Sequence, residues 1–245
     1  MEVHAHTHTS NPNSHRGRKK WTHYLWEFLM LFLAVFCGFL AEYQLEHKIE
    51  KDRAKQYIIS FFDDLKYDTS HLTQVINHYK SKEVILKFIS VCHDSVLAKT
   101  SCKTCLNGLY DNSKGFFELR TSDRTLQQLK NAGGLRLLES DDADSIIAYD
   151  NLLRGYKLDE TTTFQETQTA IRDISSELFN YAVVKDGIFA EGDLFINDDK
   201  IIINKYFNTL NRYANYTAIY IRKLERIRSE AINIINYFNK KYHLE

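Results

Sequence analysis

An uncharged apolar run near the N-terminus limits what this chain can fold into more than any other feature of the sequence. Residues 28–41 contain no charged side chain, and amphipathic aromatic residues of the kind that collect at lipid headgroups come just before them. Together these residues approach the about 17 to 25 residues that a membrane-spanning helix requires. We therefore predict a transmembrane anchor over residues 21–41. The anchor residues are Trp21, Tyr24, Trp26, Phe28, Leu33 and Phe39.

Removal of this segment by a protease is the main alternative to a permanent anchor. A signal peptidase site has small residues in an A-x-A-like pattern after the apolar core, but this core continues through Ala41 into Glu42 and Tyr43. A lipoprotein signal requires a small residue before its cysteine, whereas Phe36 precedes Cys37. A buried helix of a soluble protein is the third interpretation. The cationic head, the aromatic residues and the uncharged run together favour a retained signal anchor.

Positive charge predicts the orientation of the anchor in the membrane. The cluster Arg16 to Lys20 lies directly before the anchor, whereas the first positive residue after it is Lys48, which follows Glu42 and Glu46. Positive residues close to a transmembrane helix favour the cytoplasmic side. We therefore expect the N-terminus in the cytoplasm and the bulk of the chain outside. Glu27 lies only one turn inside the segment, so we expect its carboxylate to reach the interface.

The first part of the chain also resembles a known group of proteins. The opening MEVHAHTHTS and the stretch RKKWTHYLWEFLMLFLAVFCGFLAEYQLEHKIEKDRA are similar to the N-terminus of uncharacterised bacterial single-pass membrane proteins with a His/Thr-rich head, an apolar anchor and a charged helical stalk. TLQQLKNAGGLRLLESDDADSIIAYD, residues 125–150, is similar to a second pattern of that group. The resemblance implies a bacterial membrane anchor and attaches no activity. With the orientation above, we expect the inner membrane, with the C-terminal domain in the periplasm.

The rest of the chain is predicted to be all-α. Pro12 is the single proline and glycines number nine, so almost nothing after residue 12 interrupts a helix. We expect a disordered, cationic, His-rich head over residues 1–20, a helical stalk over 42–57 and a helical-bundle domain over 58–245. Lys plus Arg and Asp plus Glu both number 32, so the chain lacks the positive footprint of a nucleic-acid-binding protein. Nucleic acid is therefore not an expected partner.

Apolar residues at helical spacing predict the first bundle helix, and turn formers predict where the next one lies. The first stripe begins at Ile58 and has Asp68 as its one polar interruption. Its pattern continues through Leu86 and Ile89, with residues 79–83 as a candidate kink or short break. A loop rich in turn formers follows. Ser122 or Asp123 is then expected to cap a short helix. The pair Gly133-Gly134 ends that helix, because glycine adopts the left-handed conformation without a Cβ clash.

Two further helices complete the predicted bundle. Ser140, followed by acidic residues, is the expected N-cap of the first, and residues 159–168 are a weak middle or a bend in it. The last helix has the clearest pattern, because its apolar positions alternate steps of three and four. Its wide stripe favours a bundle, and a homomeric coiled coil is the alternative that the same heptads permit. The stripe consists of Ile203, Tyr206, Leu210, Tyr213, Thr217, Tyr220, Leu224, Ile227, Ala231, Ile234 and Phe238.

Three cysteines and a histidine form the strongest candidate site for chemistry. Cys102 and Cys105 form a C-x-x-C motif, and the pair Cys92-His93 lies about ten residues earlier. Three thiolates and an imidazole can bind zinc tetrahedrally, although this spacing matches no zinc motif well. In an oxidising compartment a disulfide among Cys92, Cys102 and Cys105 is favoured. Reduced cysteines without a role are the third alternative.

The histidines of the head are a second candidate metal site. His4, His6 and His8 alternate along the chain, and imidazole nitrogens bind zinc, copper and nickel. A flexible tail loses conformational entropy when it binds a ligand, so we expect weak affinity at most. A disordered polar tail without a bound metal is the favoured interpretation.

No local enzyme signature is present in the sequence. The chain lacks a nucleophile elbow, a phosphate-binding loop, an H-E-x-x-H motif and a dinucleotide fingerprint. We therefore expect no catalysis and no cofactor. The predicted function is a membrane-anchored helical scaffold or protein-interaction module of the bacterial envelope. Its partners would be the lipid bilayer and another membrane or envelope protein, or a second copy bound through the helices. The alternative is an extracytoplasmic ligand-binding sensory module that signals through a partner.

Overall fold

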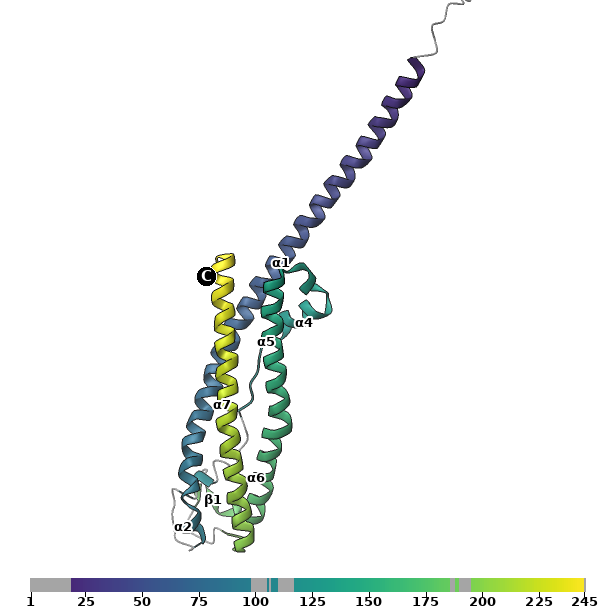
Figure 1. Cartoon of the computed structure of the whole chain (residues 1–245). Helices are drawn as coiled ribbons and strands as arrows, with labels where there is room; N and C mark the ends of the chain where they lie inside the picture. Colours follow the sequence, from purple (N-terminus) through teal and green to yellow (C-terminus); the bar gives the residue numbers. More distant parts are fainter. Residues whose placement is uncertain are drawn as a thin grey trace, which may run out of the picture. The chain divides into compact units, whose positions relative to one another are not determined.

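The structure, a computed structural model, describes residues 19–97, 105, 107–109, 117–185, 188–189 and 195–244. Within these ranges the chain is all-α apart from one two-residue strand pair, as predicted, and it divides into two units, Met1–Arg53 and Ala54–Glu245. The long helices are α1 (Lys19–Ser90), α5 (Ser140–Asp159), α6 (Gln165–Leu178) and α7 (Lys200–Tyr242) (Figure 1). The shorter helices are α2 (His93–Leu97), α4 (Arg124–Asn131), η1 (Gly134–Leu137), η2 (Glu160–Phe164) and η3 (Tyr181–Val183).

The first unit contains the N-terminal part of α1, which is long and apolar enough to cross a membrane. The side chains of the six predicted anchor residues are all between 42% and 80% exposed. Apolar side chains without protein neighbours are unstable in water and stable in hydrocarbon. This part of α1 is therefore a candidate membrane span whose side chains are free to face lipid.

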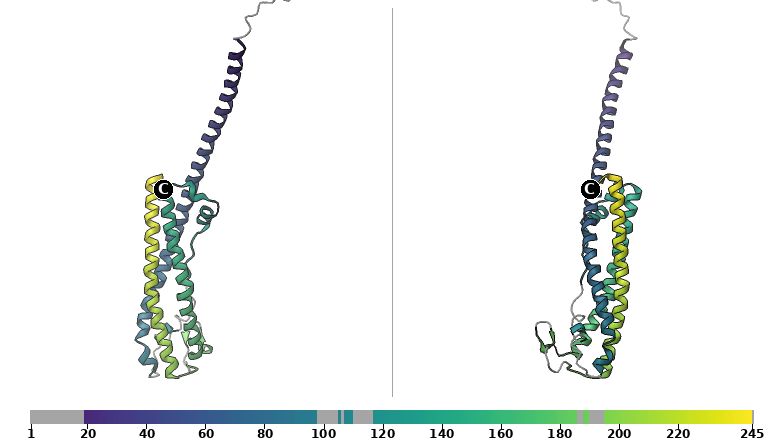
Figure 2. Two further views of the ribbon diagram at one scale, coloured as in Figure 1. Left: turned by 45° about the vertical axis from the view of Figure 1, so that its right-hand side comes forward. Right: turned by 90° about the vertical axis from the view of Figure 1, so that its left-hand side faces the viewer.

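The second unit is a bundle of three long helical segments: α1 from Ala54 onward, α5 continued by η2 and α6, and α7 (Figure 2). Aromatic contacts fix their directions. The ring of Phe61 lies 6.1 Å from that of Tyr149 and 6.5 Å from that of Phe238, while the ring of Tyr79 lies 5.3 Å from that of Phe164. Tyr79 also lies 5.1 Å from Tyr220. Therefore α1 and α5–α6 run in the same direction, and α7 runs opposite to both.

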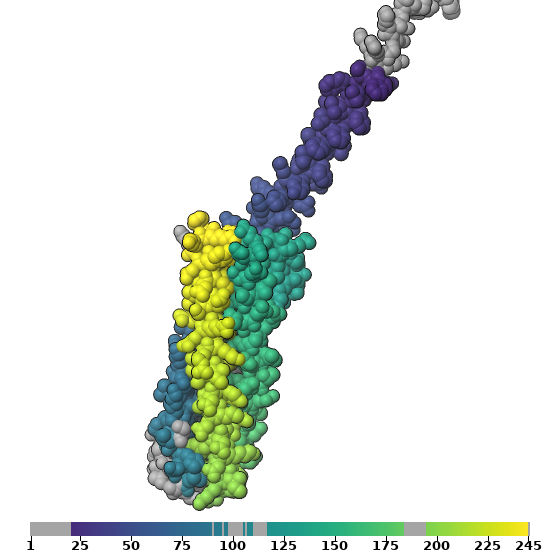
Figure 3. Space-filling model, viewed as in Figure 1, coloured from purple at the N-terminus to yellow at the C-terminus, as the bar shows by residue number. Residues whose placement is uncertain are grey.

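The predicted stripe of α7 forms one side of the bundle core. All eleven of its residues are buried, and Phe207 and Ile221, which lie next to the stripe in sequence, are buried as well. Figure 3 shows α7 packed along the α5–α6 segment on the face turned to the viewer. Because the chain itself covers this stripe, its heptads serve packing within the bundle. In this structure the stripe packs against other helices of the same chain, and not against a second copy in a homomeric coiled coil.

The expected continuation through Leu86 and Ile89 is confirmed, and the candidate break at residues 79–83 does not occur, because α1 continues without interruption to Ser90. Nothing in this stretch disfavours a helix, and two of its residues face the core. Tyr79 is fully buried, and Lys82 is buried with its ammonium 5.1 Å from the centre of the Tyr213 ring. Although most of its residues are polar, this stretch continues the buried stripe of α1.

An extended segment, residues 117–123, leads back along the bundle to α4 and α5. Asp123, one of the two predicted N-cap residues, occupies the N-cap position of α4, but its side chain makes no capping hydrogen bond. Asp64 of α1 takes this role and accepts from the Thr125 amide at 3.3 Å. The predicted helix stop is confirmed, since Gly133 has the left-handed φ of 67° just after α4.

The second helical segment contains the irregularity that the sequence indicated. Residues 160–164 form the π-helix η2 between α5 and α6, within the expected weak middle at 159–168. The predicted N-cap at Ser140 is off by one position, because Glu139 occupies the cap. The cap of α7 is a side-chain cap, since Asp199 accepts from the Ile201 amide at 2.8 Å.

Two short strands are the exception to the helical fold. β1 (Val184–Lys185) and β2 (Ile188–Phe189) pair antiparallel, with Val184 opposite Phe189. A single bridge between Phe179 and Phe195 lies beside them. These pairs lie in the connection between α6 and α7, and the fully buried Phe179 joins the core, where its ring lies 5.4 Å from that of Tyr206.

Candidate functional site: buried carboxylates and an adjoining groove

A buried glutamate at the start of the π-helix is the centre of the first polar cluster. Glu160 is fully buried, and its Oε1 accepts from the Tyr220 hydroxyl at 2.6 Å and from the Tyr156 hydroxyl at 3.2 Å. The two hydroxyls also contact each other. Lys157 donates to Glu160 Oε2 at 2.8 Å and to Glu118 at the same distance. Buried charge is stable only when it is paired and hydrogen-bonded, as it is here.

Aromatic rings enclose this cluster. The rings of Phe164 and Tyr220 stack at 4.3 Å, and Tyr79 packs edge-on against both. Burial, together with the charge of Glu160, raises the pKa of Tyr156 and of Tyr220, so both phenols stay protonated as donors. Partial burial opposes the charge of Lys157, but its hydrogen bonds to Glu118 and Glu160 outweigh this and raise its pKa.

The second cluster joins α1 to the extended segment and to α5. Asp68, which is 1% exposed, accepts from the Ser122 amide at 2.7 Å and from the Tyr149 hydroxyl at 2.9 Å. Asp64 accepts from the Ser122 hydroxyl at 2.6 Å. Burial raises the pKa of Asp68 from 3.8 to about 6, although the hydrogen bonds from Ser122 and Tyr149 lower it. Asp68 therefore titrates near pH 6.

The third cluster fastens the C-terminal end of α7 to the start of α5. Asp142 is fully buried and accepts from Lys241 at 2.6 Å, from the Tyr237 hydroxyl at 2.8 Å and from the Tyr242 hydroxyl. Lys241 also binds Glu139 at 2.9 Å. Although desolvation opposes its charge, hydrogen bonds to Asp142, Tyr237 and Glu139 raise the pKa of Lys241. Asp142 therefore joins α5 to α7, in addition to placing a favourable negative charge in the first turn of α5.

A groove lies beside these clusters, between α5 on one side and the extended segment with α4 on the other. It encloses about 390 Å³, within the range of small-ligand sites. Charged side chains of both signs and three leucines line it. The lining residues are Glu118, Leu119, Arg120, Thr121, Asp123, Leu126, Gln127, Asp150, Leu153, Arg154, Tyr156 and Lys157.

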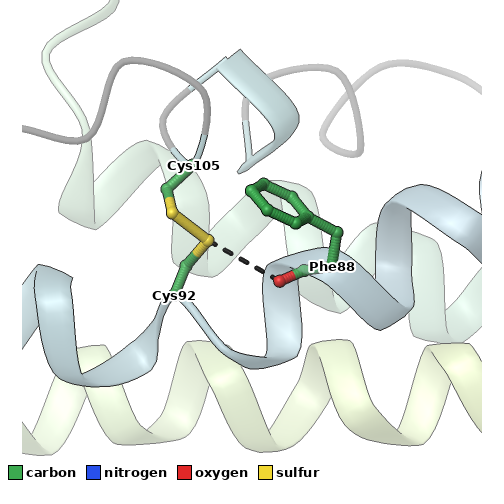
Figure 4. Close-up of a disulfide and its surroundings, with 3 residues drawn as sticks. All are labelled: Phe88, Cys92 and Cys105. Carbon is green, nitrogen blue, oxygen red and sulfur yellow. Dashed lines mark hydrogen bonds between the residues drawn. A yellow bond between two sulfur atoms is a disulfide. The ribbon is translucent and has the colours of Figure 1, made fainter.

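The cysteine site holds a disulfide in the structure. Cys92 and Cys105 are bonded, both are buried, and the Cys92 sulfur lies 3.7 Å from the Phe88 carbonyl oxygen (Figure 4). Their sulfurs are therefore not available as thiolates for the zinc site considered from the sequence. His93 instead contacts Asn204 at 2.8 Å and Asp94 at 3.0 Å. Cys102 lies outside the described residues.

The remaining candidate residues are the histidines of the head and Glu27. His4, His6 and His8 lie outside the part of the chain that the structure describes. Among the described residues, no group of three or more His, Cys, Asp or Glu side chains is arranged to hold a metal ion. Glu27 is exposed beside His23, with 3.5 Å between its carboxylate and the imidazole.

Sequence reasoning missed the two clusters around Glu160 and Asp142. Asp68 was visible as a polar interruption of an apolar stripe, and that interruption is a signal for a buried charge. Glu160 lies in a polar stretch that favours a bend, and Asp142 lies in an acidic first turn that capping explains. A further signal was available, since tyrosines rather than aliphatic residues occupy positions 213 and 220 of the α7 stripe. Buried tyrosines need hydrogen-bond partners.

Comparison with known protein families, with curated proteins and with solved structures found no match. The function of this chain is therefore argued from its own geometry.

Replacing Glu160 with glutamine should destabilise the bundle by about 1–3 kcal/mol. The amide keeps one acceptor oxygen but loses the charge that Lys157 and Tyr220 face. Glu166→Gln, at an exposed position of α6, is the matched control and should change the free energy of unfolding by less than about 0.5 kcal/mol. Urea unfolding followed by circular dichroism measures both. Equal effects of the two substitutions would contradict a stabilising role of the cluster.

Asp68 should make stability depend on pH. Because folding raises its pKa from 3.8 to about 6, its stabilising contribution is complete below pH 3.8 and is lost as pH rises through about 6. The difference corresponds to up to about 3 kcal/mol of unfolding free energy. Asp68→Asn should remove this fall, measured as Tm between about pH 4 and about pH 7.

The control for this measurement is Asp63→Asn, an exposed aspartate on the same helix. Asp64 and His71, the charged neighbours of Asp68, are unchanged in both variants. The control should keep the fall in stability of the wild type. A wild type that becomes more stable between about pH 4 and about pH 6, with the Asp68→Asn variant unchanged, would show that the sign is wrong.

Proposed function

We propose that this protein is a membrane-anchored helical interaction module of the bacterial envelope, without catalytic activity. One observation carries the proposal: α1 supplies both an exposed apolar segment that can span a membrane and a buried side of a folded bundle. A chain built in this way holds a compact domain at a membrane surface. Its resemblance to bacterial single-pass proteins supports the same assignment.

The positive cluster before the anchor and the disulfide both support a bundle outside the cytoplasm. Positive residues next to a membrane span favour the cytoplasmic side, which places the head there. Disulfides persist in oxidising compartments and are rare in the cytosol. The bond between Cys92 and Cys105 lies in the bundle and so supports a bundle outside the cytoplasm. We assign the inner membrane, with the bundle in the periplasm.

An exposed apolar face at the C-terminal end of α1 supports the interaction role. Val84 is 67% exposed and Phe88 is 43% exposed, and a step of four residues places them on one side of α1. Val91, which is 72% exposed, follows in the turn just after the helix ends at Ser90. Earlier turns of α1 expose polar side chains such as Gln74 and Asn77 at their surface. A contiguous exposed apolar patch is typical of a surface that binds another protein.

A ligand-binding sensory module is the second candidate function, and the groove beside α5 favours it. A groove of about 390 Å³ with charged walls can hold a small molecule. Signalling would then require a partner protein that reads the bound state. Both functions can reside in one protein, because the groove and the exposed face of α1 consist of different residues.

The assigned orientation predicts the behaviour of two reporter fusions at the C-terminus. A reporter that is active only outside the cytoplasm should be active, and one that is active only inside should be silent, while both fusions remain in the membrane fraction. The reverse pattern would overturn the orientation. A fusion that is soluble after cell lysis would overturn the anchor itself.

The interaction role predicts site-specific crosslinking in intact cells. A photo-crosslinking amino acid in place of Val91 should give a discrete product with one envelope protein or with a second copy of the chain. The same amino acid in place of Gln74, exposed on a polar part of α1, is the control and should give none. Identical product patterns at the two positions, or none at Val91, would contradict a binding role for this face.

A further inference from the structure

The groove beside α5 has two walls that are fixed before any ligand arrives. One wall is a single face of α5, where Asp150, Leu153, Arg154 and Lys157 follow each other at helical spacing. The opposite wall is the segment 118–123 with the first turn of α4. Binding to such a site requires little ordering of the protein, provided that both walls are held in place.

Three sets of contacts hold the segment wall. At its start, the Tyr79 hydroxyl donates to the Phe117 carbonyl at 3.0 Å and lies 3.2 Å from the Phe117 amide nitrogen. Next, Glu118 pairs with Lys157 at 2.8 Å, directly across the groove. At its end, Ser122 is held by Asp64 and Asp68 of α1 through bonds of 2.6 and 2.7 Å. The groove is therefore preorganised.

Several of the charges in the groove are already satisfied within the protein. Lys157 binds two carboxylates, those of Glu118 and Glu160. Asp150 is buried and binds two cations, Lys130 and Arg154, each at 3.0 Å. Lys157, Glu118 and Asp150 hold the walls together, so we do not assign them to a ligand.

Three exposed charges keep capacity for a ligand. The Arg120 side chain is 79% exposed, and among the described residues its one ion pair, to Glu118, is long at 3.8 Å. Arg154 uses one terminal nitrogen for Asp150 and Asn151, which leaves the rest of its guanidinium. The Asp123 carboxylate makes no hydrogen bond or ion pair with the residues that the structure describes. The groove thus offers two cations and one anion beside its three leucines.

We propose that this groove binds a free α-amino acid with an aliphatic side chain. Guanidinium groups bind carboxylates through parallel hydrogen bonds, so Arg120 and Arg154 recognise the α-carboxylate. Asp123 accepts hydrogen bonds from the α-ammonium group. Leu119, Leu126 and Leu153 take up the aliphatic side chain. The inference names the ligand class of the second candidate function and rests on it, independently of the anchor and its orientation.

Calorimetric titration of the detergent-solubilised full chain with L-leucine tests the proposal. Leucine should bind, whereas N-acetyl-leucine, without the ammonium charge, and leucinamide, without the carboxylate, should bind at least about tenfold more weakly. Arg120→Gln should weaken leucine binding by at least about tenfold, because it removes a charged hydrogen bond. Asp123→Asn should weaken it to a similar extent.

Arg222→Gln removes an exposed arginine of α7 outside the groove and should leave the affinity unchanged. Circular dichroism establishes that each variant remains folded, as expected for exposed side chains. Absence of leucine binding would overturn the proposal. Equal binding of leucine and leucinamide, or equal effects of Arg120→Gln and Arg222→Gln, would overturn it as well. Since binding does not depend on membrane sidedness, this result stays separate from that of the reporter fusions.

Discussion

The hydrogen bonds from residues 117–123 to Asp64 and Asp68 are the constraint on which the bundle depends. Two of its three long segments, α1 and α5–α6, run in the same direction, so the chain must return along the bundle between them. An extended return segment has few backbone partners of its own, and unpaired backbone groups are costly to bury. The carboxylates of α1 supply acceptors for the Ser122 and Thr125 amides. They thereby position α4, the start of α5 and one wall of the groove.

Hydrogen bonds from tyrosines to buried carboxylates join the helical segments at several places along the bundle. Asp142, Asp68 and Glu160 each accept hydrogen bonds from tyrosines on another helix or across the π-turn. A tyrosine fills the core with its ring and satisfies a charge with its hydroxyl, so one residue type serves both purposes. Pairs of this kind favour one arrangement of the helices over others, because a shifted helix would leave a charge buried without a partner.

The candidate membrane span, the exposed apolar face and the groove consist of different parts of the chain. The candidate membrane span lies in the N-terminal part of α1, and the exposed apolar face and the disulfide lie at its C-terminal end. The groove lies beside α5, where the return segment is fastened by Lys157 and the α1 aspartates. Tyr156 of α5 lines the groove and donates a hydrogen bond to Glu160, the first residue of the π-helix η2. Such π-helical interruptions of α-helices are frequent at functional sites.

The sequence by itself determined the helical class, the candidate membrane span and the buried face of α7, because apolar composition and helical periodicity are properties of neighbouring residues. It also indicated the disturbance at residues 159–168 and the stop at Gly133. Only the tertiary structure decided the roles of Asp68, Asp142 and Glu160. Each accepts a hydrogen bond from a tyrosine that is distant in the sequence, at separations of 81, 100 and 60 residues respectively. Local spacing carries no information about such partners. For the same reason the sequence left a candidate break at residues 79–83, where α1 in fact continues: the burial of Lys82 depends on Tyr213, a residue of another helix.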